Sequence, residues 1–149
     1  MNMGSGMSQG KIRIATCQFA VGASIRRNGA MIRKLMQQAK RGGADIVHFS
    51  ECALSGYAGV DIESSECIDW ELLRQETEEI LALAKKWKLW VVLGSTHRLT
   101  GPHKPHNCLY LISPGGKIVD RYDKRFCMER DMAHYSPGNH FVFFTINGV

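Results

Sequence analysis

The chain has no long apolar run, and this absence limits the kinds of protein it can be. None of its apolar stretches approaches the ~20 residues that a membrane-spanning helix needs. Residues 1–10 carry neither a basic start nor an apolar stretch, so they do not resemble a secretory signal peptide. We expect this segment to be a disordered leader or a cloning scar. We expect the protein to be cytoplasmic, with no membrane partner.

Two common ligand-binding motifs are also missing. No glycine-rich phosphate loop of the GxGxxG or GxxxxGK[ST] kind follows a predicted strand, which argues against a nucleotide-binding domain. The five cysteines are widely spaced and form no CxxC pair, so they indicate neither a structural zinc site nor a thioredoxin-type motif. His103, His106 and Cys108 lie near one another in a Gly/Pro-rich turn that lacks a fourth ligand, and a solvent-exposed loop is the favoured interpretation.

Acidic residues are in the minority, but the basic excess is not concentrated. Lysine and arginine number 19 against 14 aspartates and glutamates, which gives a formal net charge of +5. The basic residues are scattered in short pairs such as Arg26-Arg27 and Lys85-Lys86, a pattern typical of the wet faces of helices. We therefore expect no nucleic-acid partner. A hydrophobic content of 44% in 149 residues predicts one globular domain with a real core.

Hydrophobic periodicity predicts alternating strands and helices. Apolar runs over residues 11–19, 44–49 and 89–96 predict buried strands. Apolar residues at three- and four-residue spacing predict a helix after each of the first two strands. Ser24 and Asp69 are suited to begin these helices, and Gly42-Gly43 is suited to end the first. In the second helix, Leu73 and Ile80 belong to the predicted inner face and Glu76 to the outer face.

The last third of the chain predicts further strands. Segments 108–113 and 117–122 flank Pro114-Gly115-Gly116, a strong hairpin signal, and residues 141–146 predict one more strand before the Asn147-Gly148 turn. The order β-α-β-α-β-β-β indicates an α/β layered domain that is parallel at first and ends in a hairpin. Because a strand and a turn near the end predict another strand to follow, we expect the sheet to be incomplete.

Two charged residues follow predicted strands at places where open α/β sheets carry function. Glu51 leaves an apolar strand, and Leu54 and Tyr57 are expected to wall a pocket around it. Partial burial of such a carboxylate favours a raised pKa and a role as a proton acceptor. Lys124 follows another strand and supplies a fixed cation that suits oxyanion stabilisation. Taken alone, each residue is more often a surface charge or a salt-bridge partner. The two together, at this separation and in this architecture, favour a catalytic role.

The two segments resemble motifs of the nitrilase (carbon–nitrogen hydrolase) superfamily. Residues 49–57, FSECALSGY, are similar to its Pro-Glu-x-x-x-x-Gly-Tyr motif, and residues 122–126, YDKRF, to its Tyr-x-Lys motif. Asn107 before a strand, the Pro-Gly-Gly turn and the Tyr-Ser-Pro-Gly of residues 135–138 fit the same template. The resemblance covers nearly the whole chain after Gly10 and implies a partial α-β-β-α layered sandwich of the nitrilase type over residues 11–149.

The resemblance also implies roles for particular residues. Glu51 is the general base and Lys124 stabilises the tetrahedral intermediate. Glu129 matches a second glutamate that positions the substrate or assists proton transfer, and an ion pair of Glu129 with Arg130 or Lys124 is the structural alternative. Tyr57 lines the substrate pocket or packs as a core aromatic. No metal or organic cofactor is implied.

Two departures from the family pattern are evident. Ser50 stands where proline usually precedes the glutamate. The nucleophilic cysteine has no counterpart among the five cysteines, and it is expected beyond Val149, because residues 146–149 resemble the opening of the strand that carries it. Cys52 is adjacent to Glu51 and should point the other way, and Cys127, one helical turn after Lys124, is interpreted as a packed thiol.

The sequence therefore predicts a hydrolase that acts on a carbon–nitrogen bond of a small amide, carbamoyl compound or nitrile through a cysteine thioester. The 149-residue chain is expected to be inactive alone. The partners implied are a small-molecule substrate and further copies of the chain in a homodimer or higher homo-oligomer. The alternative is a non-catalytic or degenerate scaffold that binds a ligand or partner.

Overall fold

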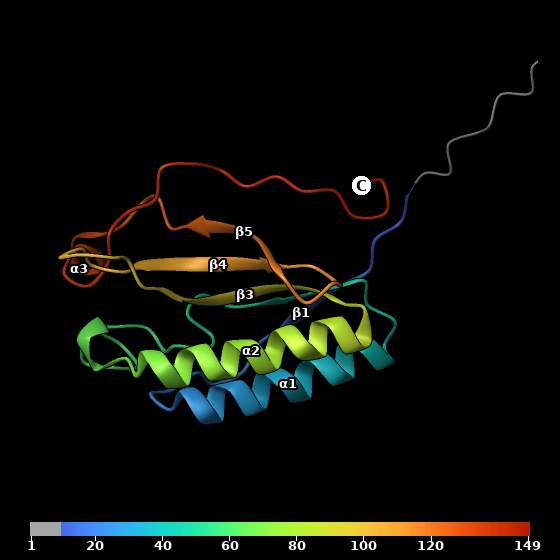
Figure 1. Ribbon diagram of the computed structural model, residues 1–149, viewed down its shortest axis with the longest axis horizontal. Coiled ribbons are helices and arrows are strands. Elements are labelled where there is room, and N and C mark those ends of the chain that lie inside the picture. Colours follow the sequence, from blue (N-terminus) through green and yellow to red (C-terminus); the bar gives the residue numbers. More distant parts are fainter. Residues whose placement is uncertain (1–9) are drawn as a thin grey trace, which may run out of the picture.

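One open five-stranded sheet organises the protein (Figure 1), whose computed structural model describes residues 10–149. The predicted leader over residues 1–10 therefore lies almost entirely outside the described part of the chain. The strands follow one another across the sheet in chain order. They are β1 (Ile14–Cys17), β2 (Ile46–Phe49), β3 (Trp90–His97), β4 (His106–Ile112) and β5 (Ile118–Asp123).

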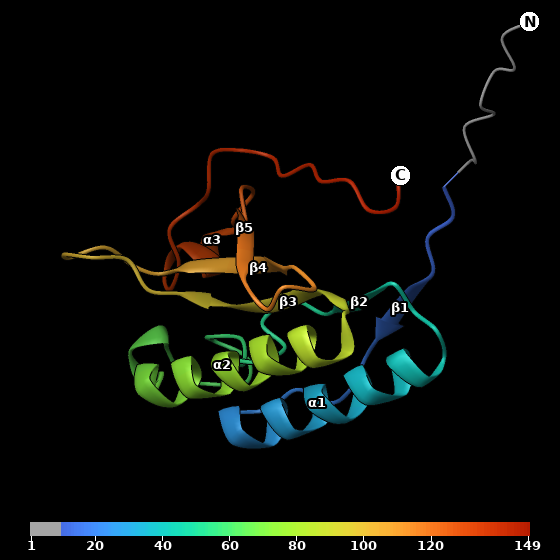
Figure 2. The ribbon, with the colours of Figure 1, turned by 45° about the vertical axis from the view of Figure 1, so that its right-hand side comes forward.

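The sheet changes direction half-way, as the sequence predicts. Strands β1, β2 and β3 are parallel, whereas β3, β4 and β5 are joined as antiparallel neighbours. The parallel strands are linked through α1 (Ile25–Arg41) and α2 (Trp70–Trp87). Both helices cover the same face of the sheet, below it in the view of Figure 2. This arrangement leaves the carboxyl ends of β1, β2 and β3 at one edge, where functional residues of open α/β sheets gather.

The helix boundaries follow the predicted caps. The Ser24 side chain accepts a hydrogen bond from the backbone N–H of Arg27 at 3.3 Å, and the Asp69 carboxylate accepts one from Leu72 at 2.9 Å. These bonds satisfy N–H groups that the first turn of a helix leaves free. The first helix ends at Gly42, and the second ends at Lys88, which adopts a left-handed conformation with φ of 51°.

The two helices contact each other through a buried ion pair, which corrects one prediction. Glu76 is only 6% exposed and accepts a hydrogen bond from the guanidinium of Arg33 on α1. The prediction that Glu76 lies on the outer face of its helix is therefore wrong. Gly29 makes the close approach possible, because a Cβ at that position would meet the Glu76 carboxylate. Apolar spacing alone does not reveal a carboxylate that is buried against a cation on the neighbouring helix.

The predicted strand over residues 141–146 does not form. This segment runs in an extended path over the sheet face that the helices leave open (Figure 1). Phe144 stacks on Trp90 with a centroid distance of 6.2 Å, while Phe141 and Phe143 stay exposed. No described strand lies beside it as a partner, and a strand without a neighbour leaves its ladder groups unpaired. A short helix that the sequence did not predict, α3 (Glu129–Met132), precedes this segment.

Among residues 10–149, no helix is both long and apolar enough to cross a membrane.

Candidate active site

Glu51 stands in a tight turn that begins two residues after β2 ends. Leu54 donates its backbone N–H to the carbonyl of Gly94 at 3.0 Å, so the turn rests directly on β3. Only glycine permits this approach, since a Cβ at position 94 would come within 1.9 Å of the Ser50 carbonyl oxygen. Cys52 continues the turn with a positive φ of 49°. The turn thereby presents the Glu51 side chain, 47% exposed, at the edge of the sheet.

Lys124 reaches Glu51 from a segment 73 residues away. It directly follows β5, and its backbone N–H donates to the carbonyl of Asn107 at 2.8 Å, which holds it beside β4. Its ammonium Nζ lies 2.9 Å from Glu51 Oε1 and 3.1 Å from the hydroxyl of Tyr57. The structure thus brings together Glu51, Lys124 and Tyr57, three of the four residues that the sequence analysis places in the site.

A further acidic residue completes this cluster. Asp131 on α3 places Oδ2 2.9 Å from the Lys124 ammonium, and its Oδ1 accepts a hydrogen bond from the Tyr57 hydroxyl. The Asp131 side chain is 1% exposed. Sequence reasoning missed this residue, because the family pattern directs attention to a glutamate and α3 was not predicted.

Glu129 lies in the same short helix but on its exposed side. Within residues 10–149, the structure gives it no hydrogen bond or ion pair with Lys124, Glu51 or Arg130. The structure therefore does not bring Glu129 into the cluster, and its role as a second catalytic carboxylate stays a prediction. The carboxylate that the fold sets against Lys124 is that of Asp131.

The pKa values of the cluster follow from burial and from mutual hydrogen bonds. Burial alone would raise the pKa of Asp131, but hydrogen bonds from Tyr57, Lys124 and the backbone of Met128 lower it to about 2. Burial alone would lower the pKa of Lys124, yet its bonds to Asp131, Tyr57 and Glu51 hold that pKa well above its usual range. Burial and the bond to Asp131 raise the pKa of Tyr57. At neutral pH, the cluster therefore contains an ionised aspartate, a charged lysine and a neutral phenol.

A small pocket of about 180 Å³ opens beside Glu51 and Lys124. Asn107 on β4 lies in its wall and donates its side-chain amide to Glu51 Oε1 at 2.6 Å. Oε1 of Glu51 therefore accepts hydrogen bonds from both Asn107 and Lys124, while no group within residues 10–149 forms a hydrogen bond or ion pair with Oε2. A carboxylate oxygen without a partner, next to a fixed cation, can accept a proton from a group that enters the pocket. The lining comprises His48, Glu51, Asn107, Cys108, Leu109, Tyr122 and Lys124.

None of the cysteines nearest to this pair is an activated thiol. Burial raises the pKa of Cys52 to about 12, and its sulfur lies 3.9 Å from the Tyr135 hydroxyl. Cys127 is partly buried, its thiol donates to the Lys124 carbonyl at 3.6 Å, and burial raises its pKa. Cys108 lines the pocket wall, but its burial also raises the thiol pKa. The interpretation of Cys127 as a packed thiol agrees with its contact and partial burial.

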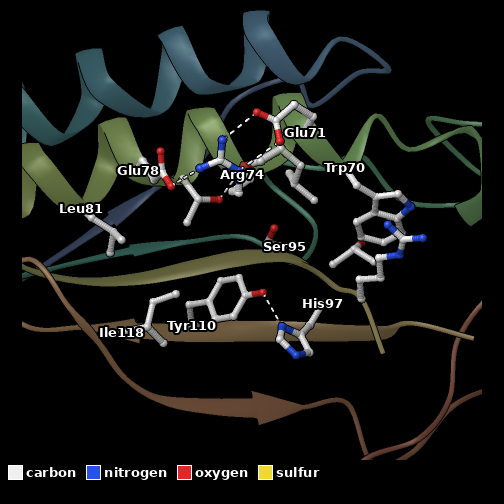
Figure 3. Close-up of a pocket in the computed structure, with 13 residues that line it drawn as sticks. Trp70, Glu71, Arg74, Glu78, Leu81, Ser95, His97, Tyr110 and Ile118 are labelled. Atoms are coloured by element: carbon white, nitrogen blue, oxygen red, sulfur yellow. Dashed lines mark hydrogen bonds and ion pairs between the residues drawn. The ribbon is translucent and has the colours of Figure 1, made fainter. Parts of the chain in front are cut away.

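A larger cleft, of about 570 Å³, lies between α2 and strands β3 and β4 (Figure 3). His97 and Tyr110 face it and share a 2.8 Å hydrogen bond, and Arg74 bridges Glu71 and Glu78 along its rim. The cleft contains no member of the Glu51–Lys124–Asp131 cluster. Its size therefore does not make it the candidate active site.

Comparison with known protein families identifies one that matches most of the chain. The sequence profile described as carbon-nitrogen hydrolase matches residues 13–145. The chain belongs to the carbon-nitrogen hydrolase family. Among curated proteins, none matches this carbon-nitrogen hydrolase chain.

Solved structures show the same fold. An amidase from Nesterenkonia sp. is 20% identical with a TM-score of 0.70, and the match covers 93% of this chain and 52% of the amidase. The NitFhit protein of C. elegans is 19% identical with a TM-score of 0.76, and the match covers 91% of this chain and 35% of NitFhit. A glutamine-dependent NAD+ synthetase from Acinetobacter baumannii is 18% identical with a TM-score of 0.74, and the match covers 92% of this chain and 26% of the synthetase.

A variant of a Nesterenkonia AN1 amidase that also matches is from the nitrilase superfamily, which the sequence motifs resemble. The chain spans about half or less of the length of these neighbours. The predicted mixed α/β fold of the nitrilase type is confirmed.

Proposed function

We propose that this chain supplies the general base and the oxyanion-stabilising lysine of an enzyme that hydrolyses small amides, carbamoyl compounds or nitriles. The observation that carries the proposal is the 2.9 Å contact between Glu51 and Lys124 at the edge of the sheet. The two residues come from segments 73 positions apart, and a surface ion pair alone would not require the buried Asp131 behind the lysine.

In the proposed reaction, Glu51 accepts the proton of a cysteine thiol, and the thiolate sulfur attacks the substrate carbon. For an amide, the carbonyl oxygen becomes an oxyanion that Lys124 stabilises by its charge. The intermediate collapses, the C–N bond breaks, and Glu51 returns the proton to the leaving amine. Water then attacks the thioester with Glu51 as base, which releases the acid and restores the thiol.

The nucleophile is the missing part of this proposal. Because the chain spans about half of its structural neighbours, we propose that the cysteine lies in sequence beyond Val149 and that the 149-residue chain is inactive alone. One neighbour supports cysteine chemistry: in a glutamate-to-leucine mutant of the Nesterenkonia amidase, the acetamide moiety of fluoroacetamide is added covalently at the active-site cysteine. The proposed chemistry needs no metal or organic cofactor, and the cytoplasm is the proposed location.

The test is ammonia release from a panel of short amides, a carbamoyl compound and a nitrile by the protein of the complete reading frame. Glu51→Gln keeps the size of the side chain and removes the base, so turnover should fall about 10²–10⁴-fold while the circular dichroism spectrum stays unchanged. Asp120→Asn, an exposed carboxylate on β5, is the matched control and should retain the wild-type rate. Wild-type turnover by Glu51→Gln would overturn the assignment of the base.

We further propose that the complete protein forms a homodimer or higher homo-oligomer. Segment 141–149 runs over the sheet face that the helices leave open, and it exposes Phe141 and Phe143. Large exposed apolar side chains that lie together mark interaction surfaces. Light scattering coupled to size exclusion measures the oligomeric mass. A monomer at micromolar concentration would contradict this part of the proposal.

A second candidate is a ligand-binding scaffold without turnover. The cleft under α2 favours it, because Ser95 at its floor carries the single buried side-chain oxygen, within residues 10–149, that has no hydrogen-bond partner. Trp70 and Leu81 contribute apolar surface to the wall of the cleft, and this lining suits a small, mainly apolar molecule with one polar group. A titration with 2-naphthoate, followed by amide shifts of Ser95 and Tyr110, tests it. Unchanged shifts at millimolar 2-naphthoate would exclude this candidate.

A further inference from the structure

Asn107 contacts both charged residues of the proposed site. It is the second residue of β4 and is only 3% exposed. Its side-chain amide donates to Glu51 Oε1 at 2.6 Å, and its main-chain carbonyl accepts the backbone N–H of Lys124 at 2.8 Å. Glu51 and Lys124 come from segments far apart in sequence, and one buried residue between them fixes the position of each.

The contact with Glu51 limits the freedom of a side chain that the solvent would otherwise leave mobile. Glu51 is 47% exposed, and the turn around it contributes backbone contacts but none to the carboxylate. Lys124 is a weak constraint, since its ammonium is shared among Glu51, Asp131 and Tyr57. An ammonium is also a rotating point charge, whereas a buried amide donates along a fixed direction.

We propose that Asn107 is the positioning residue of this site: by binding Oε1 of Glu51, it fixes the carboxylate so that Oε2 faces the incoming thiol. This inference rests on the proposed hydrolase function. A general base has to lie within hydrogen-bond reach of the proton it removes, and a misplacement of about 1 Å can cost roughly 100-fold in rate. Asn107 therefore acts through Glu51 and does not touch the substrate carbon.

A neighbouring residue provides a matched control for a merely structural role. Thr96 pairs with Asn107 across β3 and β4, is also buried, and donates its hydroxyl to Ser55 at 2.9 Å. Both residues hold the turn of residues 51–57, but only Asn107 contacts the carboxylate of Glu51. Thr96→Val loses the turn contact at nearly unchanged volume. If Asn107 serves only to hold the turn, variants at the two positions should behave alike.

The first measurement uses the 149-residue chain and needs no turnover. A scalar coupling through the hydrogen bond, between Asn107 Nδ2 and the Glu51 carboxyl carbon, should be detectable by NMR. It should survive in Thr96→Val and vanish in Glu51→Ala. If the coupling is absent in the wild-type chain, the inference is wrong.

The second measurement compares kcat and KM in the protein of the complete reading frame. Asn107→Leu should lower kcat about 10–100-fold with KM changed less than about two-fold, whereas Thr96→Val should change neither. Asn107→Asp keeps the shape of the side chain and provides a second test in case the leucine variant does not fold. Its carboxylate cannot donate to Glu51 at neutral pH but can when protonated, so its kcat relative to wild type should recover as the pH falls.

Equal kcat losses in Asn107→Leu and Thr96→Val, or a loss in Asn107→Asp that does not depend on pH, would overturn the positioning role. A wild-type protein without turnover on any substrate class would instead overturn the proposed function. The NMR coupling would still be present in that case. The two failures are therefore distinguishable.

Discussion

Replacing Lys124 by methionine tests the electrostatics of the site through folding stability. Methionine keeps the length of the side chain but removes the ammonium that lies 2.9 Å from both Asp131 Oδ2 and Glu51 Oε1. Asp131, 1% exposed, is then left as a buried carboxylate without its cation. Removing one partner of a buried ion pair typically costs about 3–5 kcal/mol.

The structure lets this magnitude be refined. Lys124 is 27% exposed, and the Tyr57 hydroxyl and the Met128 backbone N–H still donate to Asp131 in the variant. A pKa of about 2 for Asp131, against ~3.9 in an unfolded chain, corresponds to about 2.6 kcal/mol, of which Lys124 supplies only part. We therefore expect Lys124→Met to lower the free energy of unfolding by about 2 kcal/mol at pH 7.

The pH dependence follows from the direction of the Asp131 shift. A carboxylate whose pKa is lowered by folding contributes stability above its unfolded pKa of ~4, and this stability is lost as the pH falls through about 2. Lys124→Met lacks the part of this contribution that the ammonium supplies, so its deficit relative to wild type should shrink between pH 4 and pH 2.

Urea unfolding followed by circular dichroism, at pH 7 and at pH 3, measures the deficit. Lys86→Met, an exposed lysine on α2, is the control and should stay within about 0.5 kcal/mol of wild type. A deficit below about 0.5 kcal/mol, or one that is the same at both pH values, would show that the Lys124 ammonium does not stabilise the Asp131 carboxylate.

Three further predictions concern the scaffold, each measured by the same unfolding assay. Lys88→Gly should stabilise the chain by about 0.5–1 kcal/mol, because Lys88 ends α2 in a left-handed conformation with φ of 51° that glycine adopts without strain. Lys86→Gly, inside the helix, should instead cost about 1 kcal/mol, and a change of the same sign in both variants would contradict this. Gly94→Ala should cost about 3 kcal/mol, because its Cβ would meet backbone of the Glu51 turn, while Gly22→Ala, with open space, should be nearly neutral. Ser95→Ala should raise stability by about 1 kcal/mol by removing a buried hydroxyl without a partner, and a loss would show that the hydroxyl is bonded.

The parts of the fold that depend on local signals were predictable from sequence. Ser24 and Asp69 mark the two helix starts because a cap needs only one side-chain oxygen near the free N–H groups of the first turn. The Pro-Gly-Gly turn at residues 114–116 identifies the β4–β5 hairpin for a similarly local reason.

The parts that depend on distant partners were not predictable. Glu76 looks like an outer-face residue until α1 brings Arg33 to it. The segment 141–146 has the composition of a strand, but a strand also needs a neighbouring strand that pairs with its backbone N–H and C=O groups.

The candidate site divides in the same way. Glu51 and Lys124 stand out because strand ends and a known motif point to them. Asp131 carries no such signal, because its burial against Lys124 depends on α3, a helix of only four residues. Asn107 was noted as part of a motif, but its contact with Glu51 depends on the register of β4 beside β3.

The most direct test of the hydrolase proposal is ammonia release from short amides by the protein of the complete reading frame, measured for wild type and Glu51→Gln side by side. We expect steady release by the wild type and a loss of about 10²–10⁴-fold in the variant, with both proteins folded. Equal rates in the two proteins, or no release by the wild type from any amide, carbamoyl compound or nitrile in the panel, would contradict it.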